Sequence, residues 1–193
     1  MVPSRRGQGR YRACRASAAP AVPRPRGVLR LRRHRRAGSG LMRYVEAPEE
    51  FTGAGSCLFL AGGISDCPDW QKTVTAALDD LDVTLLNPRR SNFPLHDPDA
   101  EAAQVGWEYR HLRRAHLVVF WFPESPTSHQ PIALYELGVL VGEGGALVVG
   151  TDPGYVRRTN VVTQLALARP ALQVHTTLAD TIEASRAAIG ASR

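Results

Sequence analysis

Two glutamates occupy positions where a helical pattern calls for apolar side chains. Glu136 lies four residues after Ile132 and four before Leu140, and Glu108 interrupts an earlier helical pattern three residues after Val105. A buried carboxylate is costly unless it is paired or hydrogen-bonded, so both positions are candidates for nucleophilic or acid–base chemistry. The alternative is that each side chain reaches solvent or pairs with an arginine, and the helical pattern leaves both explanations open.

A glycine pair, Gly62-Gly63, follows a short apolar run and precedes Ile64. Two glycines let backbone N–H groups approach a ligand, although a simple tight turn explains them equally well. The chain lacks the GxGxxG and GxxxxGK[ST] patterns, so no dinucleotide or triphosphate site is predicted and no cofactor is expected. Several aromatic side chains near the expected loops could stack on a base or pack in the core: Trp70, Trp107, Trp121, Phe93 and Phe122.

No metal site is predicted. The six histidines show no ligand pairing such as HExxH, and the cluster His96, Asp97 and Asp99 lies in a proline-rich loop. The three cysteines stand at no metal or redox spacing, which suits a reducing compartment, so we expect a cytoplasmic protein. The longest apolar run, 138–150, contains Glu143 and is too short to span a membrane.

Charge divides the chain into two parts. Residues 1–41 hold 12 Arg and no Lys, Asp or Glu, whereas the remaining 12 basic and 18 acidic residues give 42–193 a net charge of −6. The first part has almost no periodic apolar pattern, so we expect a disordered tail. Three explanations of the tail stay open: a start placed upstream of a true Met42, a targeting segment, or an arm that binds nucleic acid.

From residue 57 onward, short continuous apolar runs alternate with amphipathic stretches. The runs predict five strands, over 57–62, 82–88, 116–122, 146–151 and 172–177. Helical spacing predicts helices over 70–81, 105–112, 132–140, 161–168 and 178–189. Continuously apolar strands are typical of a parallel sheet covered on both faces. We therefore predict one doubly wound α/β domain of flavodoxin or Rossmann type over 42–193.

Ligands of such sheets bind beyond the carboxyl ends of the strands, near the topological switch point. The loops expected to carry the site are therefore 62–69, 87–104, 122–131 and 151–160. Glu136 lies in the first turns of the helix that follows the third of these loops. Its position in the sequence thus places it close to the expected crevice.

Five stretches carry a resemblance to a known family. They are FLAGGISDCPDWQ (59–71), LLNPRR (85–90), WEYRHLRRAHLVVFWFP (107–123), PIALYELG (131–138) and GTDPGYVRRTNVVTQ (150–164). Together they resemble the nucleoside 2-deoxyribosyltransferase family, in its bacterial transferase-like branch. The stretches cover most of 57–164 in the right order, and the set is far more specific than any single member.

The resemblance implies a double displacement at the anomeric carbon of a 2′-deoxynucleoside, through a covalent glycosyl–glutamate. Glu136 matches the nucleophile of the family, and Glu108 stands where the family usually has an aspartate beside the sugar or base, assisting proton transfer to the departing base. A second base then completes a transfer, or water completes a hydrolysis. Family members assemble as dimers or larger oligomers, so a homo-oligomer is expected by analogy.

The resemblance also implies substrate-binding positions. These are Gly62, Gly63 and Ile64 for the sugar, Asn87 and Arg89 beside the crevice, and Trp121 or Phe122 for the base. Phe59 stands where well-studied members carry a tyrosine that hydrogen-bonds the nucleophile, so the orientation of Glu136 must come from elsewhere. The stretch 123–131 replaces the Ser/Gly-rich loop that holds a 5′-phosphate in nucleotide-hydrolysing relatives. This disfavours a nucleotide substrate, although Ser128 could substitute in part.

Two further functions stay open. The departures from the family pattern allow a non-catalytic module that binds a nucleoside or nucleotide-derived ligand in the same crevice. Nucleic-acid binding through the arginine-rich tail would be salt-sensitive and would disappear when residues 1–41 are removed. The acidic remainder of the chain argues against any broader nucleic-acid contact.

Overall fold

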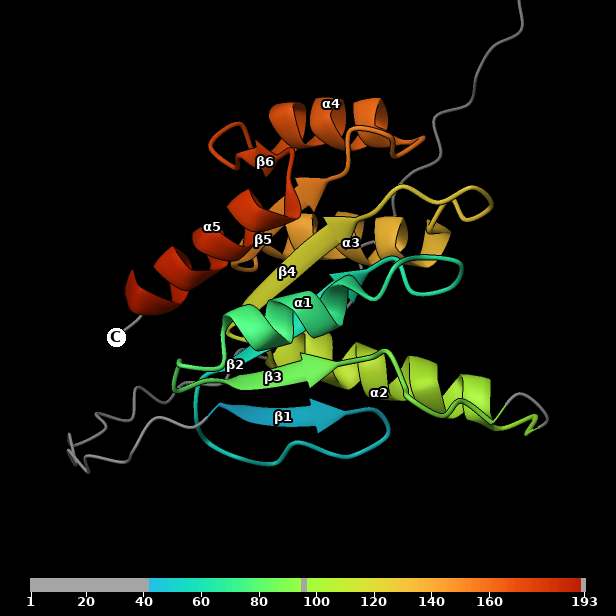
Figure 1. Cartoon of the computed structure of the whole chain (residues 1–193). Coiled ribbons are helices and arrows are strands. Elements are labelled where there is room, and N and C mark those ends of the chain that lie inside the picture. Colours follow the sequence, from blue (N-terminus) through green and yellow to red (C-terminus); the bar gives the residue numbers. More distant parts are fainter. Residues whose placement is uncertain (1–41, 95–96, 192–193) are drawn as a thin grey trace, which may run out of the picture. The chain divides into compact units, whose positions relative to one another are not determined.

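The computed structural model describes residues 42–94 and 97–191 (Figure 1). The strands are β1 (Arg43–Glu46), β2 (Cys57–Gly62), β3 (Thr84–Asn87), β4 (Leu117–Phe122), β5 (Leu147–Thr151) and β6 (Val174–His175). The helices are α1 (Trp70–Ala77), α2 (Ala100–Arg114), α3 (Pro131–Glu143), α4 (Arg158–Ala168) and α5 (Leu178–Ala191). The expected tail and His96 lie outside the described residues, so the division of the chain at residue 41 stays a prediction.

All six strands run parallel in one sheet, in the order β1-β3-β2-β4-β5-β6. The doubly wound parallel α/β fold is therefore confirmed, with one strand more than the five that the sequence predicted. The additional strand, β1, is a four-residue edge strand in which only Val45 is buried. Such a strand has no continuous apolar run, and this is why its sequence carries no strand signal.

Helices cover both faces of the sheet, as Figure 1 shows. On one face α2, α3 and α4 pack through side chains such as Trp107 and Leu137, and on the other α1 and α5 pack through Trp70 and Ile182. All six residues of β4 are buried, as expected for a central strand covered on both sides.

The helices α2 and α3 bury Leu112 and Leu140, as the helical pattern predicted, but not the residues predicted at the start of the same faces. Val105 and Ile132 are 56% and 63% exposed, whereas Trp107 and Leu137 are 1% and 5% exposed. The expectation that Val105 and Ile132 face the sheet is wrong, because the bulk of Trp107, stacked on His111 at 4.1 Å, decides which face of α2 is buried. The two glutamates, each next in sequence to a buried residue, therefore lie half-buried at the edge of the covered face.

The order of the strands places a crevice between β2 and β4. From β2 the chain passes through α1 to β3 on one side, and from β4 it passes through α3 to β5 on the other. In open parallel sheets ligands bind where the connections diverge in this way, at the carboxyl ends of the strands. The arrows of β1, β3 and β4 point toward this edge in Figure 1.

Candidate functional site

A cavity of about 540 Å³ opens at the carboxyl ends of β2, β3 and β4. Its walls come from the loops after these strands, from one side of α2 and from the first turns of α3. Six of the predicted site residues line it: Phe59, Gly62, Gly63, Ile64, Glu108 and Glu136. None of the described lining residues comes from the loop 151–160. The structure thus brings both glutamates into one cavity with the glycine turn.

Burial changes the protonation of both carboxyl groups. The pKa of Glu136 is raised from 4.5 to about 8, first by burial and then by the negative charge of Glu108. Burial also raises the pKa of Glu108, and a hydrogen bond from Gln104 opposes this in part. Two carboxyl groups that repel each other share one proton over a range of pH. One group can then act as a nucleophile while the other carries a proton.

The two glutamates differ in their hydrogen-bond partners. Gln104 lies one turn before Glu108 and donates its Nε2 to Glu108 Oε1 and to the Pro88 carbonyl, each at 2.8 Å. No described residue donates a hydrogen bond to Glu136, and Phe59, in the same cavity lining, has no hydroxyl to offer. Gln104 was not predicted, because a glutamine four residues before a glutamate is an ordinary pattern on a helix surface.

The glycine pair allows β2 and β4 to approach closely where they end. Gly62 has φ of 139°, and a Cβ at this position would collide with the carbonyl of Trp121. The Gly63 N–H donates to the same carbonyl at 3.3 Å, and the Gly63 carbonyl accepts from Trp70 Nε1 at 2.8 Å. Only glycine tolerates this geometry. The Gly63 N–H is therefore already used and is not offered to a ligand.

Asn87 and Arg89 do not line the cavity but hold its wall. One Arg89 nitrogen donates to the carbonyls of Ile64, Cys67 and Pro68 at 2.9, 3.2 and 3.1 Å. The side-chain oxygen of Asn87 accepts from the backbone N–H of Arg89 at 3.0 Å. These bonds tie the loop after β2 to the end of β3, and direct contact of either residue with a ligand stays a prediction.

Trp121 and Phe122 also lie outside the cavity lining. Trp121 is 4% exposed and packs beneath α1 and α5. Phe122 is fully buried on the opposite face, where its ring stacks on Tyr155 with the centroids 5.2 Å apart. Successive strand residues point to opposite faces of a sheet, so these two side chains support β4 from both sides. Their contact with a base stays a prediction.

Gln130 is a cavity residue that the sequence did not reveal. It adopts a left-handed conformation, with φ of 53° and ψ of 50°, directly before Pro131 at the start of α3. Its side chain is buried, its Nε2 donates to the Pro123 carbonyl at 2.7 Å, and its Oε1 packs against Gly63 without a hydrogen-bond donor. A strained backbone of this kind costs about 1 kcal/mol and is commonest at functional sites.

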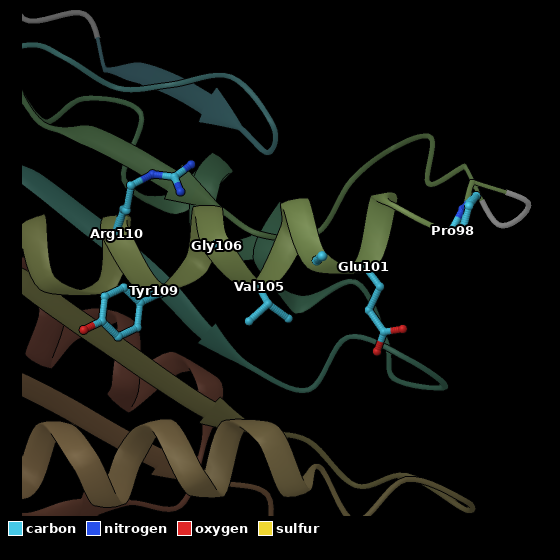
Figure 2. A pocket seen from close by; sticks show the side chains of 7 residues that line it. Pro98, Glu101, Val105, Gly106, Tyr109 and Arg110 are labelled. Carbon is cyan, nitrogen blue, oxygen red and sulfur yellow. The ribbon is translucent and has the colours of Figure 1, made fainter.

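A more open hollow of about 630 Å³ lies on the outer side of α2. Figure 2 shows Glu101, Val105 and Tyr109 pointing to one side of this helix and Arg110 to the opposite side. The hollow contains a single carboxylate and so lacks the paired groups of the first cavity. Among residues 42–94 and 97–191, no group of three or more His, Cys, Asp or Glu could hold a metal ion. None of the helices in these ranges is long and apolar enough to cross a membrane.

The cavity falls within a segment that matches a known protein family. A family model described as nucleoside 2-deoxyribosyltransferase like matches residues 56–155. The match spans just over half of the 193 residues and includes every lining residue of the cavity. No curated protein sequence gives a significant match to the chain.

Proposed function

Because the chain belongs to the nucleoside 2-deoxyribosyltransferase-like family, we propose that it is an enzyme that cleaves the N-glycosidic bond of a 2′-deoxynucleoside. The observation that carries the proposal is the pair of half-buried carboxyl groups, Glu136 and Glu108, in one cavity at the switch point of the sheet. Burial and mutual repulsion favour one ionised and one protonated carboxyl. A double displacement needs this combination.

The pair holds one proton near neutral pH, and when that proton lies on Glu108 the ionised Glu136 attacks C1′ of the sugar in the first step. The C1′–N bond breaks, its electron pair passes to the departing nitrogen, and the proton of Glu108 neutralises the base. In the second step a nitrogen of another base, or the oxygen of water, attacks C1′ and gives its proton to Glu108 while Glu136 leaves. The absence of a 2′-hydroxyl favours the positive charge that develops at C1′.

The glycine turn supplies the sugar site in this proposal. The deoxyribose contacts Gly62, Gly63 and Ile64, beside the apolar ring of Phe59. The remaining predicted residues support the cavity walls from outside the lining: Asn87 and Arg89 at the end of β3, and Trp121 and Phe122 in β4. The positions of Gly62, Gly63, Ile64 and Phe59 in the cavity lining support the sugar site. The hydrogen bonds of Arg89 to three backbone carbonyls support its role behind the wall.

A homo-oligomer and a cytoplasmic location are part of the same proposal. Large apolar side chains are exposed on α2 and α3, with exposed fractions of 56–72%, and an assembly would cover them: Val105, Tyr109, Ile132 and Tyr135. The two described cysteines, Cys57 and Cys67, are free thiols, as in a reducing compartment. The net charge of −6 over 42–193 argues against nucleic-acid binding by this part.

A second candidate function is a module that binds the same ligands without turnover. Phe59 favours it, because the family tyrosine that would orient the nucleophile is missing. Glu136 accordingly accepts no hydrogen bond from any described residue. This candidate predicts thermal stabilisation by a nucleoside with no release of its base.

The test is incubation with a panel of 2′-deoxynucleosides, with and without a second free base, followed by chromatography. A new deoxynucleoside identifies a transferase, and free base alone identifies a hydrolase. Glu136→Gln is expected to lower turnover by about 1,000-fold or more while the protein stays folded. Turnover that survives in this variant would reject Glu136 as the nucleophile. Binding without turnover in the wild type would favour the binding module.

A further inference from the structure

The loop after β3 contributes a cation and an aromatic ring to the lining of the cavity, Arg90 and Phe93. The guanidinium carbon of Arg90 lies over the Phe93 ring, 5.2 Å from its centroid. A cation–π contact of this kind uses the face of the ring and leaves the N–H donors of the guanidinium free for other partners. The two side chains therefore form one cation–π pair in the same cavity as the two glutamates.

Among the described residues, the guanidinium of Arg90 has no hydrogen-bond partner, although its charge interacts with that of Glu46. Whereas Arg89 binds three backbone carbonyls, Arg90 makes no hydrogen bond or ion pair with any residue that the structure describes. Glu46, whose charge interacts with that of Arg90, already accepts from the backbone N–H and the hydroxyl of Ser91 at 2.7 and 2.8 Å. The N–H donors of Arg90 therefore remain available to a ligand.

Phe93 differs from the other aromatic residues near the sheet edge. Its exposed fraction is 38%, whereas that of Trp70, Trp107, Trp121 and Phe122 is at most 4%. These are the five aromatic residues that the sequence suggested for stacking on a base. Phe93 alone among them presents its ring to a ligand, and an aromatic ring in a cavity is a stacking surface for a planar group.

We propose that Arg90 and Phe93 bind the base of the substrate, which rests on the function proposed above. Phe93 stacks on the base, and Arg90 donates two hydrogen bonds to O6 and N7 of a 6-oxopurine. A planar guanidinium matches two adjacent acceptors on that edge. As the C1′–N bond breaks, negative charge passes into the base, and Arg90 stabilises it there. Glu108 serves the departing nitrogen on the sugar side, so the two residues do not compete.

A phosphate group is a poorer match for the Arg90 cation. Three carboxylates, Glu101, Glu108 and Glu136, line the same cavity, and a phosphate dianion would be repelled by each of them that is ionised. A neutral base with carbonyl and ring-nitrogen acceptors meets no such repulsion. The charge balance of the cavity therefore favours the base over a 5′-phosphate as the partner of Arg90.

The test compares 2′-deoxyinosine with purine 2′-deoxyriboside, which lacks O6, as substrates of the full chain. The ratio of kcat/KM for 2′-deoxyinosine to that for purine 2′-deoxyriboside is expected to fall by about 10- to 100-fold in Arg90→Met. This is the discrimination that a bidentate hydrogen-bond contact provides. Phe93→Leu is expected to lower both values by about tenfold and to keep their ratio. Arg43→Met removes the same charge from β1, outside the cavity lining, and should behave as the wild type.

The outcomes separate this inference from the proposed function. An unchanged ratio in Arg90→Met overturns the base site and leaves the proposed function standing. A larger loss with 2′-deoxyinosine 5′-monophosphate than with 2′-deoxyinosine also overturns it, because Arg90 would then hold the phosphate. If the wild type turns over no 2′-deoxynucleoside of the panel, the proposed function fails, and calorimetry then compares the binding of these two nucleosides. Turnover of other deoxynucleosides but of neither of these two overturns the base site and leaves the proposed function standing. If the wild type binds 2′-deoxyinosine more tightly than purine 2′-deoxyriboside and Arg90→Met loses this preference, the base site is supported without the proposed function. If neither nucleoside binds, the base site and the proposed function are both overturned.

Discussion

At the scale of single residues, the protonation of Glu136 links the proposed chemistry to stability. Its pKa is about 8 in the folded protein, raised from 4.5 by burial and then by Glu108. As pH rises from 4.5 to 8, the unfolded chain releases this proton and the folded chain retains it, so the fold loses stability over this interval. The raised pKa that lets Glu136 share a proton with Glu108 therefore lowers the stability of the fold at alkaline pH.

Glu136→Gln is expected to remove this penalty. The variant should be more stable than the wild type by about 2–4 kcal/mol at pH 8.5, and the difference should shrink toward zero near pH 4.5. Urea unfolding at several pH values between 5 and 8.5 measures it. A difference that stays constant across this range would mean that Glu136 ionises normally in the folded protein.

Gln104→Met is expected to change the pH profile of turnover. The hydrogen bond from Gln104 stabilises the ionised form of Glu108, so its loss raises the pKa of Glu108 further. Turnover that depends on protonated Glu108 should then persist to higher pH, and the alkaline limb of kcat/KM moves upward. Gln164→Met, on α4 and outside this cavity lining, is the matched control. An alkaline limb that does not move would exclude Glu108 as its source.

Residues of the site could be predicted where they break a pattern, and not where they follow one. Glu136 and Glu108 stood out because a carboxylate interrupts a helical apolar pattern. Gln104 is an ordinary surface residue in sequence, and Arg90 is one of two successive arginines with different partners. The left-handed backbone of Gln130 has no sequence signal at all, because glutamine has no preference for that conformation.

At the scale of elements, the turn after β2 connects the sheet to the cavity. Gly63→Ala would place a Cβ 2.6 Å from the Cys67 sulfur and 2.8 Å from Oε1 of Gln130, and both neighbours are held within the wall. We expect a loss of about 1–3 kcal/mol in stability and at least a tenfold loss in kcat/KM.

Gly142→Ala in α3 is the control for this substitution. A Cβ at Gly142 meets nothing within 4 Å, and alanine is a better helix former than glycine. The variant should therefore gain about 0.5 kcal/mol with unchanged turnover. Thermal unfolding and initial rates of the two variants side by side make the comparison. Equal effects of the two substitutions would show that the tight packing around Gly63 has no part in the activity.

The strands that are most fully buried are the ones that the sequence predicted best. The strands β2 and β4 are continuous apolar runs, and the structure gives β2 the predicted bounds of 57–62. β1 was missed because a short edge strand with one buried residue carries no such run. The rotation of α2 and α3 was also missed, because it depends on how Trp107 and Leu137 fit against the sheet, which is a tertiary property.

At the scale of the whole molecule, the two parts of the chain carry opposite charge. Residues 1–41 contribute 12 arginines, and 42–193 has a net charge of −6. The described residues that line the cavity lie between 59 and 136, within the second part. We therefore expect that the proposed chemistry needs no side chain from the first part, and that any attraction to polyanions comes mainly from the first part.

A chain that starts at Met42 tests this separation. Its kcat/KM for deoxynucleosides should equal that of the full chain within about twofold, because it keeps every lining residue of the cavity that the structure describes. The full chain should bind a single-stranded RNA or heparin with an affinity that falls steeply as salt rises, and the shorter chain should not bind. Filter binding at 50 and 200 mM salt and parallel rate measurements distinguish the two properties. A large loss of turnover in the shorter chain would mean that the arginine-rich segment contributes to the site, and that substrate binding is not confined to the described domain.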